Sequence, residues 1–402
     1  MRLRSSLFWI LVPSLVCGLA SAVQSGQAPQ PPGDQRQKAY VFEQQGDVQK
    51  AQSAWQAVLK AHPNDAEADA HLGLLESRQE HYADAVSFYR KAAVIEPAMP
   101  GLQMNLGLAL FKNGELREAT EIFTALLKTL PEESPEALRL TTLIGLADYG
   151  SGQYAEAVPH LKKATSADPQ NLPFRLTLAH SCLRSAQYQC VLDVYKEILT
   201  LNAESAEADM LAGEALDEMK DRTAAIEQFR AAVKADAKMP EAHFGLGYLL
   251  WCELQFEDAS KEFQAELDLN PNHVQALTYL GDTQMKLSHP ESALPLLEKA
   301  VRIDPKDQLA HLDLGILHID AGRNDDALRE LKTAEQLDPN DQNVHFRLGR
   351  FYKSLGKTTE ANAEFEKTRR LQKASDASVL KKLHPIDASK SETARPSLPP
   401  SN

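Results

Sequence analysis

Three aromatic residues, Phe244, Tyr248 and Trp251, are the part of this sequence best suited to recognition chemistry. Their spacings of four and three residues place them on one stripe of a helix. Tyr279 and Asp282 follow on a later helical segment, at the corresponding place one unit further along the chain. Large aromatic side chains dominate the energy of many protein interfaces, and a row of them can hold an extended or helical peptide. The alternative is that the stripe packs against a neighbouring helix as core, and the sequence leaves both interpretations open.

Charged residues form two further candidate patches. Arg350 and Lys353, with Arg347 close by, make a small cationic group that could hold a carboxylate. An acidic stretch could hold a basic partner, and it comprises Glu207, Glu214, Asp217 and Glu218. For both patches a solvated surface is the simpler interpretation.

Residues arranged for catalysis are not evident in this sequence. It lacks the His-Glu-x-x-His and paired Cys-x-x-Cys motifs of common zinc sites. Gly245-Leu246-Gly247 lacks the preceding strand that a nucleotide-binding loop requires. His311 and His318 could share one face of a helix, since they are seven residues apart. We expect no catalytic residue, metal or cofactor, and a protein that is not an enzyme.

A 34-residue repeat sets the elements that must position these residues. Self-similarity at this period indicates a repeat array, because no single unit can bury its own apolar face. In each unit a small residue recurs before an alanine and then a large apolar residue, as in Gly281, Ala293 and Leu297. We expect the small residues to let two helices approach closely, and the large residue to fill the gap against the next unit. The prolines that mark the units are Pro63, Pro97, Pro131, Pro169, Pro271, Pro305 and Pro339, with Ala203 and Ala237 at two equivalent places.

This pattern resembles the tetratricopeptide repeat family over ten units, from about Arg36 to Leu371. The resemblance implies an all-α fold, a right-handed α-solenoid of about ten stacked helical hairpins with a concave groove. It also places His311 and His318 at packing positions, which favours a structural role for both. The Leu-Gly pair of the first helix occurs as Leu72-Gly73, Leu106-Gly107, Leu246-Gly247, Leu280-Gly281, Leu314-Gly315 and Leu348-Gly349.

The same resemblance implies which residues face the groove. The candidates are Phe244, Tyr248, Trp251, Asp282 and Arg350, with Tyr279 and Arg347 beside them. Some family members hold the carboxyl terminus of a chaperone with a clamp of Lys, Asn and Arg side chains. The first three units here offer a different set, so we expect no chaperone-tail receptor; that set is Arg36, Tyr40, His71, Gly101 and Asn105.

The chain divides into five expected segments. Residues 1–22 read as a signal peptide, 23–35 as a flexible linker rich in Gln, Pro and Gly, and 36–372 as the repeat array. Residues 373–384 could form a short capping helix, and 385–402 should be disordered. The segments outside the array are too short for a catalytic domain.

The N-terminus indicates export. Arg2 and Arg4 precede an apolar run, and Ala20-Ser21-Ala22 supplies small residues for cleavage after Ala22. The alternative is an uncleaved membrane anchor, but the run is short for a bilayer span and contains Pro13. We expect a periplasmic or secreted protein.

Two further features bear on compartment and partner. Cys182 and Cys190 could form a disulfide in an oxidising compartment, although two small buried residues are the favoured interpretation. The formal net charge of −13 argues against nucleic acid or an anionic membrane as the partner. The sequence therefore predicts a non-catalytic scaffold that binds a protein or peptide in its groove. The alternative is a structural component that associates with copies of itself.

Overall fold

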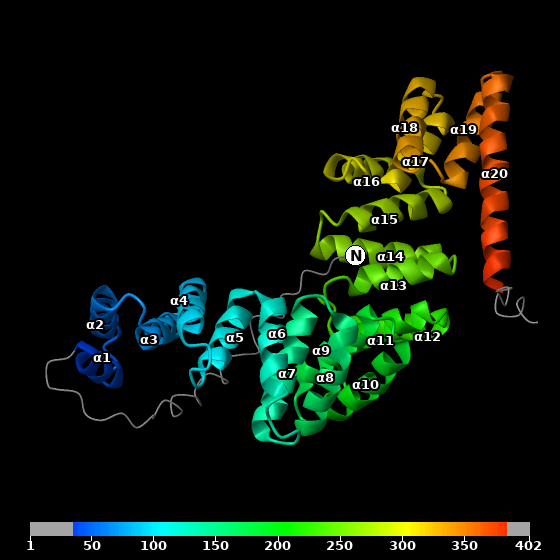
Figure 1. The fold of residues 1–402 in the computed structure, drawn as a ribbon. Helices are drawn as coiled ribbons and strands as arrows, with labels where there is room; N and C mark the ends of the chain where they lie inside the picture. The colour runs from blue at the N-terminus through cyan, green and yellow to red at the C-terminus, as the bar shows by residue number, and fades with distance from the viewer. Residues whose placement is uncertain (1–34, 384–402) are drawn as a thin grey trace, which may run out of the picture. The chain divides into compact units, whose positions relative to one another are not determined.

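The computed structural model describes residues 35–383 of the 402-residue chain. Within this range the regular structure is α-helical and is paired as ten hairpins (Figure 1). The expected all-α solenoid is therefore confirmed. The hairpins fall into two compact units, Met1–Ala235 and Asp236–Asn402. The predicted leader at 1–22, the linker to residue 34 and the tail at 385–402 lie outside the described residues.

Each unit is a row of antiparallel helix pairs. The first unit contains α1 (Gln35–Gln44), α2 (Val48–Ala61), α3 (Ala66–Arg78), α4 (Tyr82–Ile95), α5 (Leu102–Asn113), α6 (Leu116–Leu127), α7 (Pro135–Gly150), α8 (Tyr154–Ala167), α9 (Leu172–Arg184), α10 (Tyr188–Leu201), α11 (Ala206–Glu218) and α12 (Arg222–Ala235). The second contains α13 (Ala242–Cys252), α14 (Phe256–Leu269), α15 (Val274–Lys286), α16 (Pro290–Ile303), α17 (Gln308–Asp320), α18 (Asn324–Leu337), α19 (Gln342–Ser354) and α20 (Thr358–Leu383).

The two helices of a hairpin pack closely because a glycine on the first faces a large side chain on the second. A Cβ atom on Gly281 would lie 2.6 Å from Leu297 Cγ, and one on Gly213 would lie 2.7 Å from Phe229 Cδ2. Distances this short leave no room for a larger residue unless a neighbour shifts. The large side chain thus packs against the glycine of its own hairpin. The sequence pattern predicted instead that it would fill the gap between its hairpin and the next one.

A residue with positive φ lies in the turn between the two helices of every described hairpin. Glycine adopts this left-handed conformation readily, but half of these residues carry side chains. Hairpin packing therefore imposes the turn geometry even where the local sequence does not favour it. The ten residues are Gly46, Glu80, Gly114, Gly152, Ala186, Lys220, Leu254, Ser288, Gly322 and Gly356.

The last helix is unusually long. α20 has 26 residues, whereas α18 has 14. Lys373 occupies the place where Pro339 follows α18, so no proline stops α20 there. The expected capping helix at 373–384 is consequently continuous with α20 up to Leu383 and is not a separate element. In the described part of the chain, no helix combines the length and apolarity needed to cross a membrane.

Candidate functional site

Five aromatic residues of the second unit meet around Tyr279 on α15. We call them the aromatic group: Phe244, Tyr248 and Trp251 of α13, Phe263 of α14, and Tyr279. The centroid of the Tyr279 ring lies 5.2 Å from that of Trp251 and 5.4 Å from that of Tyr248, both edge-on. Edge-to-face contacts of this kind are favourable because the ring edge is positive and the ring face negative. Two neighbouring repeats are thereby joined through their first helices.

The members of the aromatic group differ in exposure. Phe244 is only 6% exposed and contacts Phe263 and His273, so it belongs to the core. Tyr248, Trp251 and Tyr279 are half-buried. Burial, with nearby acidic charges adding to it, raises the pKa of Tyr279 to about 12, which keeps its hydroxyl uncharged. The core interpretation therefore holds for Phe244, and three partly accessible rings remain as a candidate binding surface.

Asp282 links α13 to α15, the first helices of two successive hairpins, so its carboxylate is not free. It is 4% exposed and accepts a 2.7 Å hydrogen bond from Trp251 Nε1. Lys286 Nζ lies 3.6 Å from its other oxygen. A buried carboxylate needs such partners, and these two fix the orientation of the Trp251 ring.

A pocket of about 590 Å³ borders the aromatic group at Tyr279. It lies between the first turns of α15 and the turn that precedes α17. Both acidic and apolar side chains contribute to its wall. The lining residues are His273, Val274, Gln275, Thr278, Tyr279, Asp304, Lys306, Asp307, Gln308 and Leu309.

The predicted cationic residues lie on α19, in the last described hairpin. Arg350 and Lys353 are exposed, and within residues 35–383 neither has an ion-pair partner. Arg347 is half-buried, and its Nε atom is buried without a hydrogen-bond partner. The two exposed cations of this helix, Arg350 and Lys353, are thus available to an anionic group.

Other charged residues singled out by the sequence are engaged inside the first unit. Glu207 Oε1 lies 3.0 Å from His180 Nε2, and Asp217 Oδ1 lies 3.5 Å from Arg222 Nε. Arg36 forms ion pairs with acidic residues of the next hairpin, Asp65 and Glu67. These groups connect neighbouring helices, which weakens their candidacy as a binding surface.

Histidines pair repeatedly with carboxylates in this fold. His311 Nδ1 lies 2.6 Å from Glu330 Oε2, and its Nε2 lies 3.1 Å from the carbonyl oxygen of Pro305. The same arrangement recurs at His243 and His345. A histidine in this position ties the first helix to the second and to the preceding turn. His318 is buried, and burial followed by the charge of Arg323 lowers its pKa.

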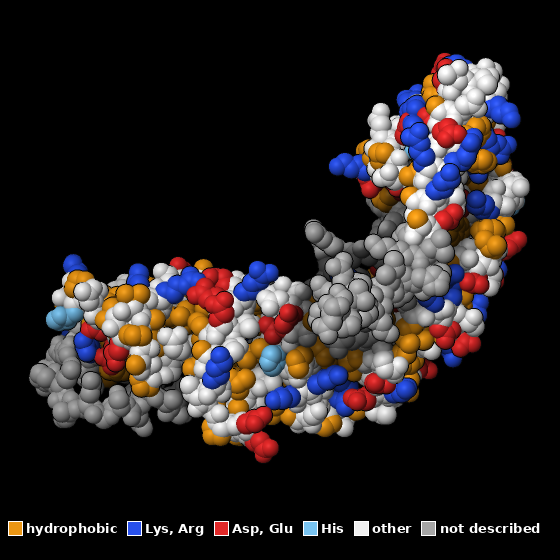
Figure 2. Space-filling model, turned by 45° about the vertical axis from the view of Figure 1, so that its right-hand side comes forward, with side chains coloured by type: hydrophobic (Ala, Val, Ile, Leu, Met, Phe, Trp, Pro, Cys, Tyr) orange, Lys and Arg blue, Asp and Glu red, His pale blue; other side chains and the backbone are white. Residues whose placement is uncertain are grey.

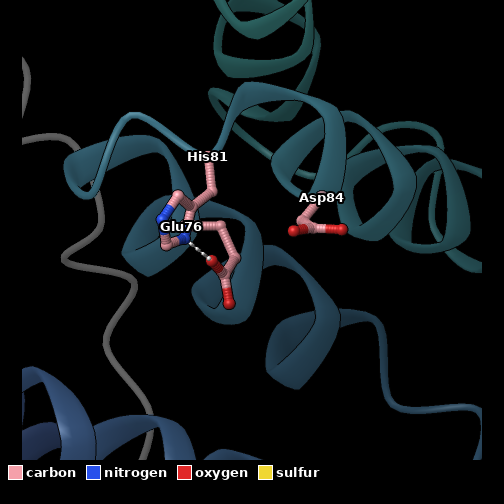
Figure 3. A group of neighbouring side chains, drawn as sticks. All are labelled: Glu76, His81 and Asp84. Atoms are coloured by element: carbon pink, nitrogen blue, oxygen red, sulfur yellow. Dashed lines mark hydrogen bonds and ion pairs between the residues drawn. The ribbon is translucent and has the colours of Figure 1, made fainter.

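Three groups of His and carboxylate residues, among those described, bring potential metal ligands within 4.8 Å of one another. In the exposed group, His81 Nδ1 lies 2.9 Å from Glu76, and Asp84 approaches from α4 (Figure 3). In the buried group of Glu241, Glu266 and His273, Nδ1 of His273 accepts a hydrogen bond from the amide of Ala276. A histidine bound to metal usually donates through its second nitrogen, so this ring is unsuited to the role. The third group is Glu335, His345 and Glu364.

Two features were missed by sequence reasoning. Cys182 and Cys190 form a disulfide with their Cα atoms 5.8 Å apart, so the favoured interpretation as two small unlinked residues is wrong. Asp313 on α17 is 3% exposed, and its Oδ2 atom has no hydrogen-bond partner. Burial, reinforced by the charge of Asp282, raises the pKa of Asp313 well above its usual value. An aspartate on a helix gives no sign in the sequence that it will be buried.

Comparison with protein families identifies the repeats. Two family models, both described as tetratricopeptide repeat, match the chain. One matches residues 77–144, 149–215, 285–341 and 318–381, and the other matches 36–101, 210–255 and 246–308. Together they cover most of the described helices.

Curated relatives are distant and much longer. Protein CTR9 homolog of Arabidopsis thaliana is 22% identical over 284 residues, which are 69% of this chain and 26% of that protein. BBSome complex member BBS4 of Bos taurus is 26% identical over 54% of this chain and 41% of its own length. Protein O-mannosyl-transferase TMTC3 of Homo sapiens is 21% identical over 69% of this chain and 28% of its own. The chain thus spans less than half of each relative.

Solved structures with a similar fold include YrrB, described as a TPR protein with an unusual peptide-binding site. It is 20% identical, with a TM-score of 0.38, over 47% of this chain and 98% of YrrB. PilF of Pseudomonas aeruginosa is 16% identical, with a TM-score of 0.43, over 55% of this chain and 94% of PilF.

Proposed function

Because the chain belongs to the tetratricopeptide repeat family, whose helical scaffold serves protein–protein interaction, we propose that its second unit binds a segment of a partner protein along α13 and α15. The observation that carries this proposal is the half-buried wall of Tyr248, Trp251 and Tyr279 beside the 590 Å³ pocket. Partly exposed aromatic rings held rigidly in place lose little entropy on binding, and they commonly dominate interface energies.

The proposed role is non-catalytic. The histidines that could act as bases, such as His311 and His345, are engaged with carboxylates and carbonyl groups between helices. One distant relative is named as a transferase, but the match covers 28% of that protein. We propose that the chain contributes recognition alone.

We also propose that the protein acts outside the cytoplasm, in the periplasm or as a secreted protein. The leader pattern that ends at Ala22 supports export. The disulfide between Cys182 and Cys190 adds support, because such bonds persist in oxidising compartments.

A display library of random peptides tests the binding proposal. Peptides selected on the wild-type chain should bind a Tyr248→Ala/Trp251→Ala variant about 30-fold more weakly, which corresponds to about 2 kcal/mol. The matched control is Lys261→Ala/Gln264→Ala on the exposed face of α14, which should leave binding unchanged. Circular dichroism establishes that both variants are folded. Equal binding by all three proteins would contradict the proposal, and recovery only of copies of the chain itself would favour self-association.

A further inference from the structure

The last hairpin exposes an aromatic residue at a place that is buried in the three hairpins before it. Phe346 on α19 is 42% exposed. Its equivalents, spaced by the 34-residue repeat, are Phe244 at 6%, Thr278 at 2% and Leu312 at 1%. Phe244 is covered by Tyr279 of α15 and by His273, the N-cap residue of that helix. No described helix follows α20, so nothing within residues 35–383 covers Phe346 in the same way.

The residues that share a helix face with Phe346 are cationic. Phe346, Arg350 and Lys353 have the spacing of Phe244, Tyr248 and Trp251, so they occupy the equivalent stripe of α19. Arg350 and Lys353 are exposed and lack ion-pair partners among the described residues. Lys367 on α20, by contrast, pairs with Glu335 and Glu364.

The charge of this end also differs from that of the rest of the protein. From residue 342 to residue 383 the chain has ten Lys and Arg residues and four Asp and Glu residues, within a chain of net charge −13. Figure 2 shows Lys and Arg side chains close together on the C-terminal part of the chain. A local cationic surface on an acidic protein attracts acidic segments selectively.

We propose that the stripe of Phe346, Arg350 and Lys353 binds an acidic segment of a partner protein. An apolar side chain of that segment covers Phe346, and carboxylates on either side of it pair with Arg350 and Lys353. This inference goes beyond the proposed function, because it adds a second binding surface on α19 and the chemical class of the segment bound there.

Fluorescence anisotropy with a labelled peptide tests the proposal directly. The probe has one Leu flanked on each side by Glu residues, and the comparison probe replaces every Glu with Gln. The full chain should bind the Glu probe at least about tenfold more tightly than the Gln probe, and added salt should reduce the difference. An Arg350→Glu/Lys353→Glu variant should lose this preference. The matched control is Arg230→Glu/Lys234→Glu on α12, which reverses two exposed charges elsewhere and should keep the preference.

Several outcomes would overturn the proposal. One is equal binding of both probes, or a preference that survives in Arg350→Glu/Lys353→Glu. Another is a wild-type dimer in sedimentation experiments that this variant abolishes, because the occupant would then be a second copy of the chain. The proposal would also fail if the Glu probe bound neither the full chain nor a chain truncated after Leu383. The Tyr248→Ala/Trp251→Ala variant leaves the residues of the α19 stripe unchanged. A loss of library-selected peptides in that variant therefore tests the proposed function, independently of the acidic probe.

Discussion

Trp251 Nε1 and Asp282 Oδ2, 2.7 Å apart, form a hydrogen bond that joins the first helices of two successive repeats. Since Asp282 is 4% exposed, its carboxylate depends on this donor and on Lys286. Changing Trp251 to Phe keeps a ring but removes the N–H group. We expect the second unit to lose about 1–3 kcal/mol of unfolding free energy, measured by urea denaturation.

A double-mutant cycle isolates this bond. Because Asp282→Asn removes the charge that needs the donor, Trp251→Phe should cost less in the Asp282→Asn background than in the wild type. A coupling energy of at least about 0.5 kcal/mol is expected for partners in direct contact. Additive effects of the two changes would show that the hydrogen bond contributes nothing to stability.

Reduction of the disulfide should loosen the fifth hairpin. Cys182 and Cys190 join α9 to α10 across a short loop, and closing such a loop stabilises a fold by about 2–3 kcal/mol. Hydrogen exchange followed by mass spectrometry should show faster exchange across α9 and α10 after dithiothreitol is added. A Cys182→Ser/Cys190→Ser variant should exchange quickly with or without the reductant. Unchanged exchange in the reduced wild type would contradict this prediction.

The sequence predicted the repeats much better than it predicted the surface. Leu-Gly pairs and prolines recur, so the hairpins follow from spacing and close packing. The burial of Phe244 could not be distinguished from the partial exposure of Tyr248, because both belong to one apolar stripe. Phe244 is buried by Phe263 of the second helix and by His273 of the next repeat, and its own stripe does not reveal these contacts. The disulfide had the same limitation, since spacing alone does not give a distance between Cα atoms.

Asp313 should make stability depend on pH. Burial raises its pKa well above 3.8, so the folded protein keeps a proton that the unfolded chain releases above about pH 4. The resulting contribution to stability is complete below pH 4 and is lost as pH rises through the raised pKa. Asp313→Asn cannot ionise. Relative to the wild type, this variant should therefore gain unfolding free energy as the pH rises from 4 to 8, measured by urea denaturation. Parallel stability curves for the two proteins would contradict the account.

Lys373→Pro should shorten α20. Proline at this place restores the stop that follows α18 at Pro339, so the helix should end near residue 371. Circular dichroism should show the loss of about ten helical residues, with the urea midpoint of the array almost unchanged. Lys373→Ala is the control and should keep the full helical signal. A large fall in the midpoint of Lys373→Pro alone would mean that the extension stabilises the repeats.

Site-specific photo-crosslinking tests the central claim most directly, which is that the surface of Tyr248, Trp251 and Tyr279 contacts a partner protein. A photoreactive phenylalanine analogue replaces Tyr248 in cells that produce the full chain, and Gln264 on the exposed face of α14 serves as the control position. We predict a crosslink to one partner protein from position 248 and none to that partner from position 264. If both positions yield the same products, or position 248 yields only copies of the chain, the binding surface lies elsewhere.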